Sequence, residues 1–231
     1  MIVDAIIPAL DEEATIAGVI GEFRAHCRRV VVVDNGCRDR TAERARDAGA
    51  IVVAEARRGY GAACLAGIAT LEALGPPDVV LFLDGDGADD PADLPRLLEP
   101  LREARAELVL GSRTLPESRN EPGALLPQQR VGNLVATTLI RLLYGARQTD
   151  LGPYRAIRWA ALRSLDMSDP TYGWTVEMQC KALRSGVRTV EVASRWRRRR
   201  GGESKVSGTV WGTIGAGWKI LWTVARYSLV T

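Results

Sequence analysis

Short apolar runs and longer mixed stretches alternate along the first half of the chain. The apolar runs are rich in β-branched residues and bounded by polar residues or glycine, as buried strands are. They predict strands over Ile2–Ile7, Arg29–Asp34, Ala50–Ala54, Val79–Asp84 and Glu107–Arg113. The stretches between them predict helices over Glu12–Ala25, Asp39–Ala48, Gly61–Leu74 and Ala92–Ala104. This alternation favours an α/β fold, a mostly parallel central sheet flanked by helices on both faces.

In a sheet of this kind a ligand binds beyond the carboxyl ends of the strands. Polar residues and glycines follow every predicted strand and therefore share one edge. After the first three strands they are Pro8, Asp11 and Glu12, then Asp34, Asn35 and Gly36, then Arg57 to Gly61. After the last two they are Asp84 and Asp86, then Ser112 and Arg113. A nucleotide site at this edge is the economical interpretation, and ordinary polar loops are the alternative.

The fourth predicted strand runs into an acidic cluster, FLDGDGADDP, in which Asp84 and Asp86 alternate with glycine. Carboxylates this close repel one another, so a positive group must share the site. Mg²⁺ or Mn²⁺ suits carboxylate oxygens and completes its shell with substrate phosphates. We therefore predict that Asp84 and Asp86 bind a divalent cation. For Asp89 and Asp90 the alternative is helix capping, because Pro91 suits the first turn of a helix.

Composition places the chain among soluble globular proteins of one domain, with or without an appendage. It has 231 residues, of which 46% are hydrophobic and 26% charged, and a net charge of +3. The basic block Arg195–Arg200 makes the charge uneven. The four cysteines lack zinc-site spacing and fit a reduced, cytosolic setting, and His26 is the only histidine. We expect neither a secretory signal nor a transmembrane helix.

The motifs IPALDEE, VVDNGCRD, RRGYGAACLAG, FLDGDGADDP and GSR, in this order, resemble those of family 2 glycosyltransferases with the GT-A fold. TDLGPYRAI and GGESKVSGT narrow the resemblance to dolichyl- or polyprenyl-phosphate sugar synthases. It runs from Ile7 to about Thr209. It implies a Rossmann-like GT-A domain over residues 1–209, followed by an amphipathic helix over residues 210–231.

The resemblance assigns the donor-binding residues. Pro8, Asp11 and Glu12 match a Pro-x-x-Asn-Glu motif that lines the nucleotide. Asp34 matches the carboxylate that bonds the base or ribose. Asp84 and Asp86 match the motif that holds the metal and the diphosphate. Gly61 and Arg113, at the ends of other strands, are assigned to the donor as well. In these donor motifs the chain departs from the family pattern at Asp11 for asparagine, Asn35 for a second aspartate and Ala88 for glutamine, and it has Leu151 to Arg155 where relatives often carry Gln-Cys-Gly-Phe-Arg.

The late motifs concern the phosphates, the sugar and the acceptor. By resemblance Arg200, Ser204 and Lys205 belong to a loop that closes over donor phosphates and acceptor, and a solvated basic turn is the alternative. Asp150 is expected near the sugar or acceptor, and Arg155 facing the acceptor phosphate. Glu177 is a candidate for sugar hydroxyls. Trp174 is a candidate for the sugar ring face, with core packing as the alternative.

The nature of the acceptor decides which chemistry is needed. A hydroxyl acceptor needs a general base, whereas a lipid phosphate is already an anion and needs cations to steer it. We predict inverting transfer of a hexose from a UDP- or GDP-sugar to a polyprenyl phosphate, with Asp86, Asp150, Arg155 and Arg200 at the reaction centre. One alternative is a small soluble acceptor. Another is a non-catalytic module that binds RNA or membrane phosphate, although we expect no nucleic acid because clustered carboxylates repel it.

Two apolar stretches raise the question of a membrane, GNLVATTLIRLLYG and VWGTIGAGWKILWTVARYSLV. The second places tryptophans at helical spacing among basic residues, which suits the lipid headgroup zone. We therefore expect a peripheral protein at the cytoplasmic, inner face of the membrane. The alternative is a helix buried against the sheet or a partner subunit.

Overall fold

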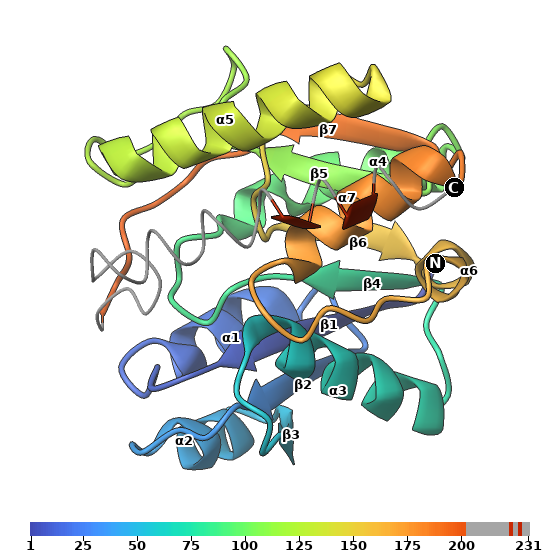
Figure 1. The fold of residues 1–231 in the computed structure, drawn as a ribbon. Coiled ribbons are helices and arrows are strands. Elements are labelled where there is room, and N and C mark those ends of the chain that lie inside the picture. The colour runs from blue at the N-terminus through green and yellow to red at the C-terminus, as the bar shows by residue number, and fades with distance from the viewer. Residues whose placement is uncertain (202–221, 224–225, 228–231) are drawn as a thin grey trace.

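A computed structural model describes residues 1–201, 222, 223, 226 and 227. Within these residues the chain forms a seven-stranded sheet (Figure 1). The strands are β1 (Val3–Ala9), β2 (Arg29–Asp34), β3 (Ile51–Ala54), β4 (Val79–Phe82), β5 (Leu108–Ser112), β6 (Arg155–Arg158) and β7 (Thr189–Ala193). Their order across the sheet is β3-β2-β1-β4-β6-β5-β7, and only the pairings of β6 with β4 and β5 are antiparallel. The predicted mostly parallel α/β sheet is confirmed.

Helices cover both faces of the sheet. They are α1 (Ile16–Arg24), α2 (Thr41–Asp47), α3 (Tyr60–Ala73), α4 (Leu94–Arg102), α5 (Pro127–Tyr144), α6 (Trp159–Ser164) and α7 (Trp174–Arg184), with a 3₁₀ turn at Pro91–Asp93. Successive strand residues point to opposite faces. Ala5 and Ile7 of β1 therefore pack in one core with α1 and α4, whereas Ile6 packs in a second core with α3, α6 and α7.

Trp174 belongs to the second core. Its side chain is fully buried, and its ring lies 4.7 Å from the ring of Phe82 in β4. The alternative of core packing is therefore correct for this tryptophan. Truncating a buried aromatic of this size typically costs about 3–5 kcal/mol of stability.

The chain order of the strands reverses between β1 and β4, the neighbours at the centre of the sheet. A reversal of this kind opens a crevice beyond the carboxyl ends of the two strands. Glu12 follows β1, and Asp84 and Asp86 follow β4. The topology therefore brings the predicted nucleotide and metal residues to the same crevice.

The predicted amphipathic helix over residues 210–231 lies outside the described residues, except for Trp222, Thr223, Arg226 and Tyr227. Ser204 and Lys205 also lie outside them. Tyr227 contacts the body of the protein, because its hydroxyl donates a 2.6 Å hydrogen bond to Glu177. Among the described residues, no helix combines the length and the apolar character needed to cross a membrane.

Candidate active site

The loop after β4 turns back on itself and gathers three carboxylates. The backbone N–H of Asp84 donates to Oδ2 of Asp89 at 2.9 Å, and the N–H of Ala88 donates to Oδ1 of Asp86, also at 2.9 Å. Gly87 adopts a left-handed φ of 77°, which glycine tolerates best. The loop therefore holds these carboxylates at the carboxyl end of β4.

The third and fourth aspartates of the acidic cluster have separate roles. Asp90 caps the 3₁₀ turn, since its side chain accepts a 3.0 Å hydrogen bond from the N–H of Ala92, and Pro91 lies at the first position. Helix capping is thus confirmed for Asp90. Asp89 instead bonds back to Asp84 and so takes part in the acidic site.

The electrostatics of this loop favour a bound cation. Loss of hydration and the neighbouring Asp86 carboxylate raise the pKa of Asp84 to about 7. Burial and the charge of Asp84 raise the pKa of Asp89 well above its ordinary range. The Oδ1 atom of Asp89 is buried and has no hydrogen-bond partner in the described part of the chain. Asp84 and Asp86 thus fit the oxygen ligands that Mg²⁺ and Mn²⁺ prefer.

An arginine of this chain lies between Glu12 and the acidic loop after β4. Residues 195–201, here called the basic strap, cross the carboxyl edge of the sheet after β7. Arg199 forms an ion pair with Glu12, and its Nε lies 3.5 Å from Oδ2 of Asp86. Burial raises the pKa of Glu12 although the Arg199 charge opposes this shift. The positive charge that the acidic cluster requires is therefore supplied, in this structure, by the chain itself.

Other arginines tie the basic strap to the same edge. The N–H of Arg200 donates to the backbone oxygen of Asp86 at 3.1 Å, and its guanidinium lies 2.5 Å from Glu22 of α1. Arg197 contacts Glu22 at 2.8 Å and the backbone oxygen of Asp89 at 2.6 Å. Arg197 and Arg200 are thus held by Glu22 and by backbone oxygens of the acidic loop, while Ser204 and Lys205 of the same predicted loop lie outside the described residues.

The predicted nucleotide carboxylate Asp11, after β1, reaches the loop after β2, whereas Asp34, the last residue of β2, bonds within its own loop. Asp11 has a left-handed φ of 55°, and its Oδ1 accepts a 2.7 Å hydrogen bond from the N–H of Arg38. Asp34 accepts a 2.7 Å bond from the N–H of Cys37. Ligand atoms of Asp11, Cys37 and Asp39 lie within 4.8 Å of one another. The hydrogen bonds show that Asp11 joins the two loops and that Asp34 holds the turn after β2.

Three more predicted positions shape the same loops. Pro8 is half-buried near the end of β1. Asn35 joins the loops after β2 and β3, because its side-chain oxygen accepts a 2.8 Å bond from the N–H of Gly59. Gly61 is buried, and a Cβ there would lie 2.0 Å from the backbone oxygen of Asp169. Close backbone packing therefore explains this glycine.

The predictions for Arg155 and Glu177 need correction, because both side chains are fully buried. Arg155 donates to backbone oxygens, including that of Thr175 at 3.0 Å, and burial lowers its pKa to about 10. Glu177 accepts a 2.7 Å bond from the N–H of Asp169 and pairs with Lys181 at 2.9 Å. A side chain enclosed by protein groups cannot face an acceptor phosphate or a sugar, so both residues are structural here.

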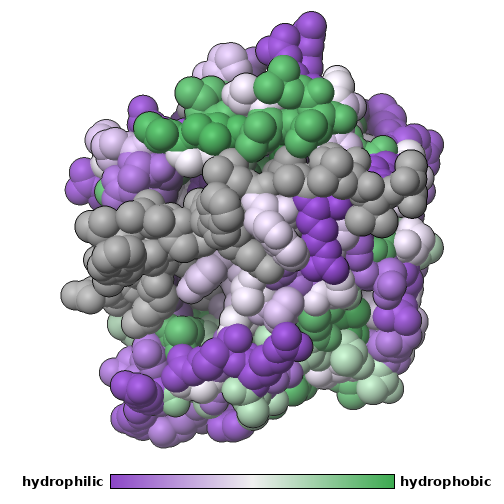
Figure 2. All heavy atoms as spheres, viewed as in Figure 1, coloured by the Kyte–Doolittle hydropathy of each residue, from purple (hydrophilic) through white to green (hydrophobic). Residues whose placement is uncertain are grey.

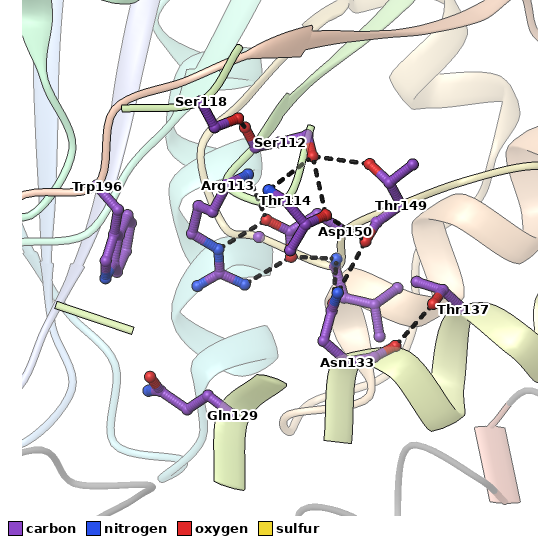
Figure 3. A network of polar contacts seen from close by, with 12 residues as sticks. Ser112, Arg113, Thr114, Ser118, Gln129, Asn133, Thr137, Thr149, Asp150 and Trp196 are labelled. Carbon is purple, nitrogen blue, oxygen red and sulfur yellow. Dashed lines mark hydrogen bonds and ion pairs between the residues drawn. The ribbon is translucent and has the colours of Figure 1, made fainter. Parts of the chain in front are cut away.

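Arg113 and Asp150, predicted separately, form a buried ion pair (Figure 3). Nε and Nη2 of Arg113 each lie 2.7 Å from a different oxygen of Asp150, and the N–H of Arg113 donates to Asp150 at 2.8 Å. The guanidinium also lies 4.9 Å from the ring centroid of Trp196. Burial alone would raise the pKa of Asp150, but Arg113 outweighs it and holds this pKa below its ordinary range.

Beside this ion pair lies a cavity of about 730 Å³ between the segment after β5, helix α5 and residues 147–149. Its lining is strongly basic and otherwise rich in hydroxyl and amide groups. The arginines that line it are Arg113, Arg130, Arg141 and Arg147. Arginine presents a planar fork that binds phosphate or carboxylate at two points. The cavity is therefore suited to an anionic ligand.

Sequence patterns did not single out several residues that shape the site. Arg199 was one member of a basic run, without a sign that it alone would reach Asp86. Arg141 lies within the apolar stretch GNLVATTLIRLLYG and Arg147 just after it, and no local pattern indicated that either would line a cavity. Glu191 of β7 accepts a 3.1 Å bond from the N–H of Asp150 and so positions the turn that carries this residue. No local sequence pattern indicated this role for Glu191.

Comparisons with known proteins agree with this geometry. The sequence matches the family described as Glycosyl transferase family 2 over residues 4–165, more than half of the chain. A Mycobacterium tuberculosis protein named as an uncharacterised glycosyltransferase is 36% identical over 222 residues, which cover 95% of this chain and 97% of that protein. An undecaprenyl-phosphate mannosyltransferase of Micrococcus luteus is 33% identical over 221 residues, covering 90% of this chain and 88% of the relative.

A solved structure shares the fold. Glucosyl-3-phosphoglycerate synthase from Mycobacterium tuberculosis, in complex with Mn²⁺, UDP-glucose and phosphoglyceric acid, superposes with a TM-score of 0.77 at 24% sequence identity. The likeness covers 100% of this chain and 80% of that chain. It confirms the predicted GT-A type of α/β fold.

Proposed function

Because the chain belongs to glycosyltransferase family 2, we propose that it transfers a hexose from a UDP- or GDP-sugar to a polyprenyl phosphate, with inversion at the anomeric carbon. The observation that carries this proposal is the position of Arg113. This residue lines the arginine-rich cavity, and its charge also acts on Asp84 of the acidic loop. The acidic edge would hold the donor, and the cavity would receive the anionic acceptor.

In the donor half, Glu12 and the loops after β1 and β2 would contact the nucleotide. Asp84 and Asp86 would hold a divalent cation, Mg²⁺ or Mn²⁺. When bound, this cation offsets the negative charge that grows on the departing diphosphate. The Mn²⁺ and UDP-glucose bound in the structurally similar synthase support this assignment.

The basic strap would change partners when the donor binds. Arg199 now pairs with Glu12 and Asp86, which are also proposed to contact nucleotide and metal. Arriving phosphates offer the guanidinium a charge-assisted partner in exchange. Arg199 and Arg200 would then bind the donor diphosphate. Ser204 and Lys205, farther along the same segment, are proposed to close over it.

In the acceptor half, the cavity would take the phosphate group of the lipid. Within the described residues, Nη1 of Arg113 makes no hydrogen bond, so it is available to a phosphate oxygen. That oxygen would attack the anomeric carbon while the bond from this carbon to the donor diphosphate breaks. Since a phosphate is already ionised near neutral pH, no proton has to be removed.

Asp150 would orient Arg113 in this reaction. Its carboxylate is buried, bonded to Arg113 at two points and of lowered pKa, so it is a weak proton acceptor. A weak base suits a phosphate acceptor better than a hydroxyl acceptor. The acceptor named for the Micrococcus luteus relative, undecaprenyl phosphate, also belongs to this chemical class.

The place of action would be the inner face of the membrane, because a polyprenyl chain remains in the lipid while its phosphate reacts. Peripheral association is sufficient for this arrangement.

A second candidate acceptor is a small soluble phosphorylated molecule. The observation that favours it is the cavity lining, since four arginines and many hydroxyl and amide groups suit a compact anion. The phosphoglyceric acid bound by the structurally similar synthase is such a molecule.

Substitution of the cavity arginines tests the acceptor assignment. Arg130→Gln and Arg141→Gln should each raise KM for a short-chain polyprenyl phosphate at least about tenfold, because a charge-assisted contact is typically worth about 1.5–3 kcal/mol. Hydrolysis of the donor without acceptor should be unchanged. Arg163→Gln is a matched control, since Arg163 of α6 pairs with Glu72 at the surface. Unchanged acceptor kinetics in both cavity variants would refute the assignment.

A further inference from the structure

Helix α5 presents an apolar face that no described part of the chain covers. Its inner side packs on α7, where Ile140 contacts Val176 and Cys180. On its outer side the exposed large apolar residues are Val131, Leu134, Val135, Leu142 and Leu143. Val131 and Leu142 are 63% and 74% exposed. Figure 2 shows hydrophobic side chains gathered in a band where Figure 1 places α5.

We propose that this apolar face of α5 docks on an anionic lipid bilayer. Residues at intervals of three and four, as Val131, Leu134, Val135 and Leu142 are, share one side of a helix. An amphipathic helix of this kind lies in the plane of the membrane interface and buries its apolar side in the headgroup and acyl boundary.

Charge identifies the lipid as anionic. Residues 122–149 contain Arg130, Arg141 and Arg147 and no aspartate or glutamate. All three arginines are exposed. Basic residues beside an apolar face are attracted to anionic headgroups. A second copy of this chain would suit the face poorly, because a two-fold contact between identical α5 helices brings arginines together without carboxylates to pair with them.

The docking face is continuous with the arginine-lined cavity. Arg130, Leu134 and Arg141 belong to α5 and also line the cavity. A bilayer beneath α5 would therefore lie beside the mouth of the cavity. A lipid could keep its chain in the bilayer while its phosphate reaches Arg113. This part of the proposal rests on the proposed function, and it explains how the lipid acceptor reaches the active site.

Sedimentation with vesicles tests the docking face. The full chain is mixed with vesicles of phosphatidylcholine alone or with phosphatidylglycerol added, at low and high salt. We expect binding to the anionic vesicles and weaker binding at high salt, because salt screens the attraction. Val131→Gln/Leu142→Gln should lower vesicle affinity at least about tenfold, since two apolar side chains no longer enter the lipid. Neither residue lines the cavity, so donor hydrolysis should be unchanged.

Ile51→Gln/Leu74→Gln is the matched control, because these exposed apolar residues lie on β3 and after α3. It should bind vesicles as the unchanged protein does. Equal binding by Val131→Gln/Leu142→Gln would overturn the proposal. Loss of a dimer in that variant without lipid would show that a second copy covers the face. A lower melting temperature with unchanged vesicle binding would show that another part of this chain covers it.

The docking proposal and the proposed function fail in different ways. Vesicle binding through α5, together with transfer only to soluble acceptors, would retain the docking face and refute the lipid acceptor. Transfer to a short-chain polyprenyl phosphate in detergent, without any vesicle binding, would retain the function and refute the docking face.

Discussion

Arg113 and Asp150 lie 37 positions apart in the sequence and meet in a two-point ion pair, with Nε–Oδ2 and Nη2–Oδ1 distances of 2.7 Å. Asp150 is almost fully buried, whereas Arg113 reaches the cavity lining. The carboxylate therefore fixes the direction of the guanidinium, and the guanidinium can present its remaining nitrogen to an anion. This relationship makes Asp150 a positioning residue in our account.

Asp150→Asn should raise KM for the acceptor at least about tenfold, because a misdirected Arg113 loses a charge-assisted contact worth about 1.5–3 kcal/mol. Donor hydrolysis without acceptor should be nearly unchanged when corrected for the folded fraction. Steady-state kinetics with varied acceptor distinguish the two effects. A kcat that falls a thousandfold and recovers at high pH would instead identify Asp150 as a general base.

The double variant Arg113→Gln/Asp150→Asn supplies the control for stability. Asp150→Asn alone leaves Arg113 without its carboxylate, and breaking a buried pair in this way typically costs about 3–5 kcal/mol. The double variant removes the unpaired charge, so much of this stability should return while the acceptor KM remains high. Recovery of the acceptor KM as well would contradict a role for Arg113 in binding.

The same pair predicts a pH dependence of stability. The pKa of Asp150 is depressed in the folded protein, since Arg113 outweighs the effect of burial. Its stabilising contribution is therefore present above the unfolded pKa of about 3.9 and is lost as the pH falls through the folded pKa. Urea unfolding at a series of pH values from neutral downward should show a shallower decline below this pH for Asp150→Asn. Identical slopes would mean that the pair does not shift this pKa.

Arg199→Gln should strengthen the binding of Mn²⁺ to the protein without donor, because the guanidinium no longer competes for Glu12 and Asp86. A partly exposed pair is typically worth up to about 1 kcal/mol, so we expect a gain of about three- to fivefold. Titration calorimetry measures it. Arg198→Gln is the control, since Arg198 bonds Glu121 and Pro122. Weaker Mn²⁺ binding by Arg199→Gln would show that Arg199 supports the site.

Asp86→Asn should abolish Mn²⁺-dependent donor binding and lower kcat at least about a hundredfold, as loss of a group that stabilises developing charge does. The fold should persist, because asparagine retains the oxygen that accepts the N–H of Ala88. Mn²⁺ titration followed by electron paramagnetic resonance gives the binding, and thermal unfolding gives the stability. Retention of full activity would refute the proposed metal site.

Apolar runs predicted β1 to β5 because these strands are buried or pack against helices. Strands in such an environment consist mainly of apolar residues, which the sequence shows directly. The acidic cluster after β4 could be recognised as part of a site, because the chain topology brings the ends of parallel strands together. β7 was missed. Like β3 it is an edge strand with partly exposed residues, but Glu191 interrupts its apolar character.

Local sequence patterns could not predict which charged residues are buried. Arg155 is enclosed because backbone oxygens from residues 151, 152 and 175 surround its guanidinium. Glu177 is enclosed because the turn at residues 168 and 169 supplies hydrogen-bond donors to its carboxylate. These partners come together only in the folded chain. The contact between Arg199 and Asp86 likewise spans more than 100 residues and depends on how the basic strap crosses the sheet edge.

The central claim, transfer to a lipid phosphate, is tested most directly by offering acceptors in parallel. The purified full chain is incubated with Mn²⁺ and a panel of UDP- and GDP-sugars, together with polyprenyl phosphate, polyprenol or 3-phosphoglycerate. Mass spectrometry then identifies the glycosylated product, and NMR gives its anomeric configuration. Our account predicts a polyprenyl-phosphate sugar of inverted configuration and no product from polyprenol. Efficient transfer to 3-phosphoglycerate, with polyprenyl phosphate inert, would contradict it.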